Sequence, residues 1–229
     1  ITLFHGGFST GHGYLREPND IRSYTALACI AIQANQNEMH ESQGIPNFDY
    51  AMAPGIDKTY RKAYFSSLRQ YWQILLGFSH DDAMALAEEV KEQLGTDLAL
   101  TRTDAFGEAL IQWLPRHQAE KGFHPISPEE AKASHQYAVR QAEEETDAAC
   151  WQAMEALIHN LNTMNSRAGA QVPYSSLNYG TDTSPQGRMV IRNLLKATEA
   201  GLGDGGMPIF PVHIFKVKEG VNLNPSVPN

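Results

Sequence analysis

Polar side chains that could contact a phosphate or a sugar gather in the segment SRAGAQVPYSSLNYG. Arg167 and Gln171 lie near a chain turn, and Ser175, Ser176 and Asn178 lie on a predicted strand. Because successive strand residues point to opposite faces, we expect the two serines on different sides of a sheet. A strand face that carries serine and asparagine, close to an arginine, could bind phosphate or ribose. A strand with one solvated face fits the same pattern equally well.

Two glycine-rich segments could also approach a ligand. The first, GGFSTGHG, lies between a predicted strand and a predicted helix, where backbone amides can bind an anion. A plain tight turn explains it more simply, since the Gly-Lys-Ser/Thr ending of a P-loop is missing. The second, GLGDGG, contains G-x-G-x-x-G, but a helix precedes it and a strand follows it. That order predicts a helix C-terminus and a turn instead of a dinucleotide site.

Side chains that often carry catalysis or bind metals give weaker signals. The nine histidines form no H-E-x-x-H pattern, and the two cysteines, Cys29 and Cys150, lie far apart in helix-like surroundings. We interpret both cysteines as buried thiols, without a disulfide framework. A G-x-S-x-G nucleophile elbow is missing from the sequence. No histidine pattern supports a metal site, and residue order alone leaves a Ser-His-Asp triad open.

The elements that must position these residues follow from apolar spacing and capping residues. Six helices are predicted: from Ile21 with Asn19 or Asp20 as its cap, over 58–76, over 81–94 after Ser79, over 104–114 before Pro115, over 127–165, and over 185–200. Strands are predicted over 1–4, 172–180 and 207–217. The chain is therefore expected to be helix-rich α/β, with its strands near both ends.

Length and charge restrict the kind of protein. The chain has 229 residues, a formal net charge of -8 and 42% apolar residues, which is ordinary for a globular protein. An acidic chain is a poor ligand for a nucleic-acid backbone, although it can still bind a single nucleotide. We expect no nucleic-acid partner and no membrane partner, and the few cysteines favour the cytoplasm. Because the chain opens with ITLFHGG and stops in NPSVPN, we expect an internal piece of a longer protein.

Several longer blocks resemble anaerobic (class III) ribonucleoside-triphosphate reductases. The blocks are FSTGHGYLREPNDIRS, IQANQNEMH, IPNFDYAMAPG, SRAGAQVPYSSLNYGTDTSPQGRMVIRNLLKATEAGLG and MPIFPVHIFKVKEGVNLNP. The resemblance covers residues 4–225 and is weakest over 58–133. It implies a partial ten-stranded α/β barrel of the ribonucleotide reductase and glycyl radical enzyme type. Residues 1–229 would be the N-terminal and central part of this catalytic barrel domain, without the ATP cone, the finger-loop cysteine, the zinc site or the glycyl radical region.

The resemblance also implies the chemistry of the whole enzyme. A glycyl radical generates a cysteine thiyl radical, which abstracts hydrogen from the ribose 3′ carbon before water leaves the 2′ carbon. Formate supplies the reducing equivalents, and an iron–sulfur activase that uses S-adenosylmethionine installs the radical. The implied substrates are ribonucleoside triphosphates. ATP or deoxynucleotide effectors would bind at a homodimer interface, to which the helix over 127–165 is expected to contribute. The family's active-site cysteines, zinc cysteines and glycyl motif would lie outside residues 1–229. We therefore assign this chain no catalytic residue, no metal ligand and none of the cofactors, including a structural zinc.

Two groups of residues are implied as substrate contacts. The first lines the barrel: Arg167, Gln171, Ser175, Ser176 and Asn178. The second closes a barrel helix and faces the same cavity: Asn35, Gln36, Asn37, His40 and Gln43. This sequence has His-Glu-Ser-Gln-Gly over 40–44, where relatives carry His-Gly-Gly-Gln-Ser, so backbone freedom is lost and a carboxylate is added.

Two alternative functions remain open from the sequence. One is another glycyl radical enzyme of the formate-lyase type, which the block NYGTDTSPQGR with PIFPVHIFKV argues against. The other is a non-catalytic helical module for nucleotide binding or dimerisation. Deoxynucleotides would stabilise the reductase and the module but would leave a formate-lyase relative unaffected.

Overall fold

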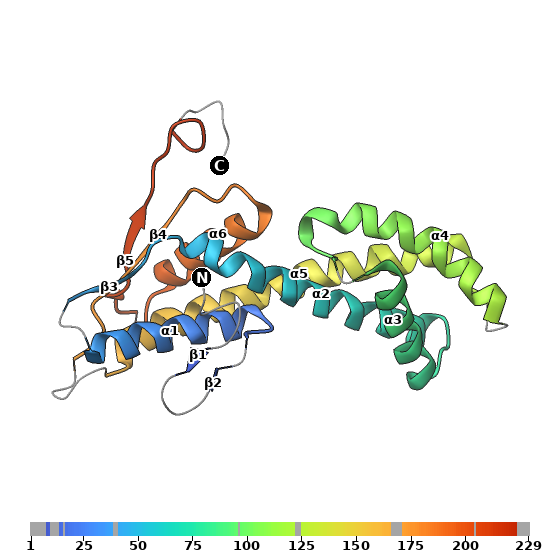
Figure 1. The fold of residues 1–229 in the computed structure, drawn as a ribbon, viewed down its shortest axis with the longest axis horizontal. Coiled ribbons are helices and arrows are strands. Elements are labelled where there is room, and N and C mark those ends of the chain that lie inside the picture. Colours follow the sequence, from blue (N-terminus) through green and yellow to red (C-terminus); the bar gives the residue numbers. More distant parts are fainter. Residues whose placement is uncertain are drawn as a thin grey trace. The chain divides into compact units, whose positions relative to one another are not determined.

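A computed structural model describes residues 8–9, 14–15, 17–38, 41–95, 97–121, 125–165, 171–203 and 205–223. The chain forms two compact units (Figure 1). The first, here called the sheet unit, comprises residues 1–56 and 147–229, and the second, the helical unit, comprises residues 57–146. Two helices, α2 (Phe48–Leu75) and α5 (Pro128–Thr163), contribute residues to both units.

The sheet unit is built around three short parallel strands. They are β3 (Gln43–Ile45), β4 (Ser175–Tyr179) and β5 (Val212–Phe215), with β4 in the centre. Helices α1 (Ile21–Glu38) and α6 (Pro185–Ala200) belong to the same unit. A separate antiparallel pair joins β1 (Phe8–Ser9) to β2 (Tyr14–Leu15). Six α-helices and a parallel sheet among the described residues confirm the helix-rich α/β architecture. The described strands do not close into a barrel, so the ten-stranded barrel stays a prediction.

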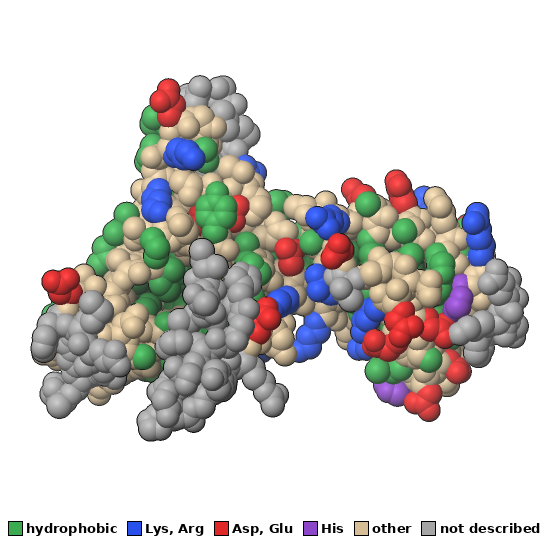
Figure 2. Space-filling view, in the orientation of Figure 1, with side chains coloured by type: hydrophobic (Ala, Val, Ile, Leu, Met, Phe, Trp, Pro, Cys, Tyr) green, Lys and Arg blue, Asp and Glu red, His purple; other side chains and the backbone are tan. Residues whose placement is uncertain are grey.

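The helical unit has an aromatic core. It contains α3 (His80–Leu94), the short 3-10 helix η1 (Leu100–Arg102) and α4 (Thr103–Lys121), together with parts of α2 and α5. Tyr64 packs edge-on against both Phe65 and Phe106, with ring centroids 5.6 Å apart in each case. Tyr60 and Trp72 are fully buried in the same cluster. Figure 2 shows acidic side chains gathered over α3, on the outside of this unit.

Helix starts that depend on local side chains are confirmed. Asp20 caps α1 by accepting the backbone N–H of Ser23 at 2.8 Å. The hydroxyls of Ser79, Ser127 and Ser184 each accept a backbone N–H three residues ahead at 3.1 Å, and they begin α3, α5 and α6. At the far end of α6, Gly201 has φ +75° and its N–H donates to Thr198 O. The GLGDGG segment is therefore a helix end, as predicted.

Two helix boundaries were predicted wrongly, and each helix contains a proline near the missed boundary. The α2 helix begins at Phe48 instead of 58 and runs through Pro54, because Phe48, Met52 and Ile56 form one fully buried stripe at four-residue spacing. The α4 helix continues through Pro115 to Lys121 instead of ending at 114. In both helices a proline removes one hydrogen bond, and burial of apolar side chains, which in α4 include Leu110 and Leu114, outweighs that loss.

The strands also differ from the prediction. The β5 strand covers only four residues of the predicted 207–217. The β3 strand was not predicted, because its three residues lack an apolar alternation and gain their order from pairing with β4. Gln43 was expected to close a helix. It lies on the β3 strand instead. The predicted strand over 1–4 and most of the GGFSTGHG segment fall outside the described residues. No helix of the described part has the length and apolarity needed to cross a membrane.

Candidate functional site

The two faces of β4 differ in what covers them. Ser175, Leu177 and Tyr179 are buried, whereas Ser176 and Asn178 between them are half-buried. The Tyr179 hydroxyl contacts Nδ1 of His213 at 3.1 Å, and Nε2 of the same ring contacts the Thr198 hydroxyl of α6, also at 3.1 Å. The face that carries Ser175, Leu177 and Tyr179 is therefore the one packed on α6. The prediction that the two serines point to opposite sides is confirmed.

The other face of the sheet, called the open face below, carries a short polar strip. In the parallel register, Ser176 on the central strand pairs with Gly44 on one side and Val212 on the other, and Asn178 pairs with Ile214, so these five residues share the open face. Val212 and Ile214 are 51% and 42% exposed, which leaves the polar strip bordered by accessible apolar side chains. Figure 2 shows hydrophobic side chains over the region where Figure 1 places the sheet.

Gly44 makes room for the hydroxyl on this strip. A Cβ atom at Gly44 would lie 2.8 Å from Ser176 Oγ, closer than a carbon and an oxygen normally approach. The missing side chain therefore lets the Ser176 hydroxyl lie over β3. A hydroxyl and a carboxamide two residues apart offer donors and acceptors that match ribose hydroxyls or phosphate oxygens.

Ser175 lies in a different environment from its neighbour. Its side chain is 2% exposed, and Oγ has no hydrogen-bond partner among the described residues. Gln43 pairs with it on β3, donating its N–H to Tyr174 O at 2.8 Å and its side-chain amide to Glu41 O at 3.2 Å. The structure thus brings Gln43, Ser175, Ser176 and Asn178 into adjacent strands and divides them between two faces.

The remaining predicted contacts are less closely placed. Asn35 is exposed and Gln36 is buried near the end of α1, where Asn37 follows in the helix. Gln171 is exposed and lies just before β4. His40 and Arg167, and the side chain of Asn37, lie outside the described residues.

The loop after β4 contains functional groups that the sequence did not single out. The Asp49 carboxylate is fully buried, and its Oδ2 accepts the backbone N–H groups of Gly180, Thr181 and Asp182 at 2.8, 3.2 and 3.0 Å. Three successive amides that converge on one point form an anion-binding nest. Here a carboxylate of the chain itself fills it. The segment IPNFDYAM gave one usable signal, an acid in the first turn of a helix, where the dipole favours negative charge.

Side chains that follow β3 and β5 form further hydrogen bonds at the same edge of the sheet, where the three strands end. Lys216 donates from Nζ to Asn47 Oδ1 at 2.7 Å, which joins the end of β5 to the end of β3. The Asn222 amide donates to Gly180 O at 2.6 Å and to Lys216 O at 2.8 Å. The carboxyl ends of all three strands are therefore tied together by side-chain hydrogen bonds. In parallel α/β sheets, ligands bind outside this edge.

The two cysteines are buried thiols, as interpreted from the sequence. Burial raises the pKa of Cys29 to about 11, partly offset by a hydrogen bond with Asn160. Burial raises the pKa of Cys150 to about 12. Both stay protonated at neutral pH and are poor nucleophiles. Burial lowers the pKa of His213, which favours the neutral ring between its two hydroxyl partners.

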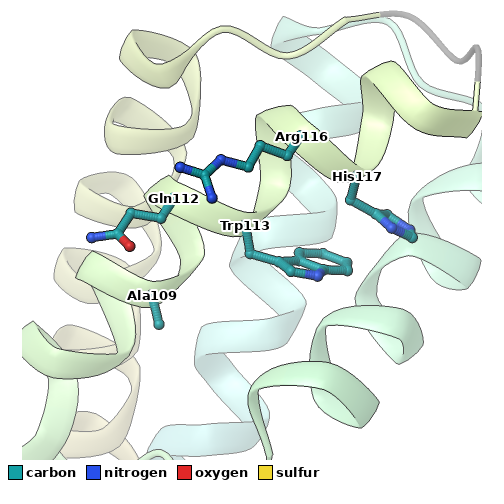
Figure 3. A pocket seen from close by; sticks show the side chains of 5 residues that line it. All are labelled: Ala109, Gln112, Trp113, Arg116 and His117. Atoms are coloured by element: carbon teal, nitrogen blue, oxygen red, sulfur yellow. The ribbon is translucent and has the colours of Figure 1, made fainter.

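A pocket of about 380 Å³ lies on α4 in the helical unit and is lined by Ala109, Gln112, Trp113, Arg116 and His117 (Figure 3). The rings of Trp113 and His117 stack with centroids 4.2 Å apart, and His117 Nε2 lies 2.5 Å from Glu89 Oε2. Figure 3 shows both rings pointing to the same side of the helix, away from Arg116. Because every lining residue belongs to one helix, the pocket is a shallow surface feature.

Comparison with known proteins identifies the family. The model of the anaerobic ribonucleoside-triphosphate reductase family matches residues 1–228. The enzyme of that name from Enterobacteria phage T4 is 38% identical over 93 residues, which are 40% of this chain and 15% of the phage protein. Those from Haemophilus influenzae and Escherichia coli K12 are 35% and 30% identical over 81 residues, 35% of this chain and 11% of each relative.

The matched segments thus span only a small part of these relatives. The family match, by contrast, runs along nearly all of this chain and includes the strands β3, β4 and β5. The chain therefore belongs to the anaerobic ribonucleoside-triphosphate reductase family.

Proposed function

We propose that this chain is part of an enzyme that reduces ribonucleoside triphosphates to deoxyribonucleoside triphosphates. The family match supports the proposal, and the polar strip on the open face of the sheet is the observation that carries it. In the proposal, β3, β4 and β5 are three strands of a ten-stranded α/β barrel, and the open face looks into it. Further strands of the complete protein would extend the sheet beyond β5.

The residues of the strip bind substrate and leave the radical chemistry to other parts of the enzyme. The Ser176 hydroxyl and the Asn178 amide would hydrogen-bond ribose hydroxyls or phosphate oxygens. Accessible Val212 and Ile214 beside them would exclude water from one side of the sugar. Ser175, on the face packed against α6, would then affect stability more than binding.

The glycyl radical, formate and structural zinc belong to the proposal but not to these residues. A structural zinc site of this kind needs four clustered thiolates, whereas both cysteines here are buried and protonated. Within the described ranges, no three His, Cys, Asp or Glu side chains are grouped so that they could hold a metal ion. The described residues therefore do not fit the zinc, and we assign no metal or radical step to them.

The wider setting of the enzyme is likewise proposed from the family. It comprises an iron–sulfur activase that uses S-adenosylmethionine, ATP or deoxynucleotide effectors, and a homodimer in the cytoplasm. The α5 helix, 36 residues long, is the proposed contributor to the dimer interface, because the family resemblance implies an interface built from helices. No effector contact is assigned.

The test is an anaerobic assay of the complete protein that contains residues 1–229. With its activase, S-adenosylmethionine, formate and each ribonucleoside triphosphate, we expect deoxynucleotide formation matched by formate oxidation. Turnover of an acyl substrate without nucleotide reduction would favour the formate-lyase type. Nucleotide binding without turnover, by a protein confirmed to carry the radical, would favour a binding module.

The same assay examines the strip. Ser176→Ala and Asn178→Ala should each raise KM about tenfold, the equivalent of one lost hydrogen bond to substrate. Ser175→Ala is the matched control, one residue away on the other face, and should leave KM unchanged. An increase in KM for Ser175→Ala alone would place the substrate on the opposite face.

A further inference from the structure

The Asp49 carboxylate occupies a position that phosphate commonly fills in α/β proteins. The loop of residues 180–182 follows a parallel strand and precedes the N-terminus of α6, an arrangement that favours anions. Its three convergent N–H groups are all taken by Asp49 Oδ2, which is completely buried. A substrate phosphate therefore cannot use this nest while Asp49 is present.

The other groups of the loop are also fixed by side chains. Tyr50, next to Asp49, donates its hydroxyl to Thr181 O at 2.8 Å. Asp182 accepts the N–H of Ser184 at 2.9 Å, and its carboxyl group lies so close to Gly187 that a Cβ there would be 2.3 Å from Asp182 Cγ. Together with Asn222 on Gly180 O, these contacts hold the loop from the α2 side, the α6 side and the β5 side.

The position of Asp49 connects this loop to the polar strip. Asp49 follows β3 by four residues, and its partners begin directly after β4. It therefore joins the carboxyl ends of the two strands that carry Gly44, Ser176 and Asn178. A shift at Gly180 would displace Asn178, two residues before it, because the strand backbone between them is extended.

We propose that Asp49 is a positioning residue of the substrate site: its carboxylate fills the amide nest in place of a phosphate and holds the carboxyl end of β4 where Asn178 meets the substrate. This rests on the proposed function. It also implies that the substrate triphosphate is bound by groups other than the loop of residues 180–182.

The experiment uses chemical rescue in the complete protein. Asp49→Ala empties the nest, and acetate supplies a carboxylate of matching size. Acetate is preferred because formate is itself the proposed reductant. We expect kcat/KM for the ribonucleoside triphosphate to fall about 10²-fold, mainly through KM, as for a contact misplaced by about an ångström. Acetate, but not chloride at equal ionic strength, should restore KM and raise the melting temperature of this variant.

Two further variants keep the test decisive. Asp49→Asn preserves shape and folding, should raise KM by a smaller factor, and should not respond to acetate because the nest stays filled. Asp147→Ala is the control, since its carboxylate accepts hydrogen bonds from the side chains of Arg192 and Asn193, away from the nest. It should keep the KM of the wild-type enzyme.

Specific outcomes would overturn the proposal. They are an Asp49→Asn enzyme with wild-type KM, or an Asp49→Ala enzyme that loses kcat at constant KM and ignores acetate. Failure of the wild-type enzyme to reduce ribonucleotides would instead refute the proposed function. The acetate-dependent melting shift of Asp49→Ala would still report separately on the nest.

Discussion

The helical unit buries rings against rings, whereas the sheet unit buries polar side chains against backbone. In the helical unit, Tyr60, Tyr64 and Trp72 are fully buried in one cluster. In the sheet unit, Asp49, Asp182 and Asn193 are nearly or fully buried, and each hydrogen-bonds to the backbone of a loop or a helix. The difference teaches where sequence change is tolerated. Apolar packing accepts substitutes of similar volume, but a carboxylate that accepts three N–H groups has no equivalent.

The largest expected effect tests the helical unit by removing its biggest ring. Trp72→Ala should reduce the free energy of unfolding by about 3–5 kcal/mol, because a large cavity opens in a fully buried cluster. Ile74→Ala, at a side chain 69% exposed, is the control and should change it by less than about 0.5 kcal/mol. Urea denaturation gives the free energies.

Hydrogen exchange of the same variants shows whether the comparison between units holds. Amides of residues 57–146 should exchange faster in Trp72→Ala, while those of β4 and α6 keep their rates. Equal acceleration in both regions would mean that the two units unfold as one, and would break the comparison.

The next effect tests the dependence of the sheet unit on backbone geometry. Gly180 has φ +115°, and a Cβ there would lie 2.8 Å from the Phe215 ring and 3.0 Å from Lys216 O. Gly180→Ala should therefore reduce the free energy of unfolding by about 1–3 kcal/mol. Gly203→Ala, with no atom within 4 Å of the added carbon, should be neutral or slightly stabilising. Similar losses for both variants in thermal unfolding would contradict the geometric argument.

The smallest expected effect is a dependence of folding stability on pH, to which one histidine in each unit contributes. Burial lowers the pKa of His135, an effect that nearby Asp104 partly opposes, and burial alone lowers the pKa of His213. The unfolded chain then binds protons more readily than the folded one. The resulting stability is complete above the ordinary histidine pKa of 6.5 and decreases as the pH falls toward the lowered value in the folded state.

Replacing either ring should make stability less sensitive to acid. His135→Gln and His213→Gln should each reduce the slope of the free energy of unfolding against pH by at most about 1.4 kcal/mol per pH unit. Urea denaturation from about pH 7.5 to about pH 5 measures this slope. The Tyr64 hydroxyl, 2.7 Å from His135 Nδ1, is available to a glutamine side chain, so folding should persist. An unchanged slope in both variants would mean that other groups bind the proton.

Much of the sheet unit could be predicted, because its signals are local or belong to the family. The α6 helix has the predicted bounds, β4 lies within the predicted strand, and Ser175 and Ser176 alternate as expected. The two wrong helix boundaries lie in different units: the start of α2, near Pro54, belongs to the sheet unit, and the end of α4, near Pro115, belongs to the helical unit, where the resemblance is weakest. A proline is a local signal, and the buried stripes that override it in α2 and α4 become visible only when the helices pack.

The sequence by itself determined the family, the capped helix starts and the alternation along β4, since each depends on residues a few positions apart or on a long ordered match. The tertiary structure decided the rest. It gave β3 its partner, placed Ser176 on the open face and Ser175 on the covered one, and brought Asp49 to amides more than 130 residues away in sequence. Such contacts depend on long-range packing, and a buried carboxylate is stable only where packing brings several N–H donors to it.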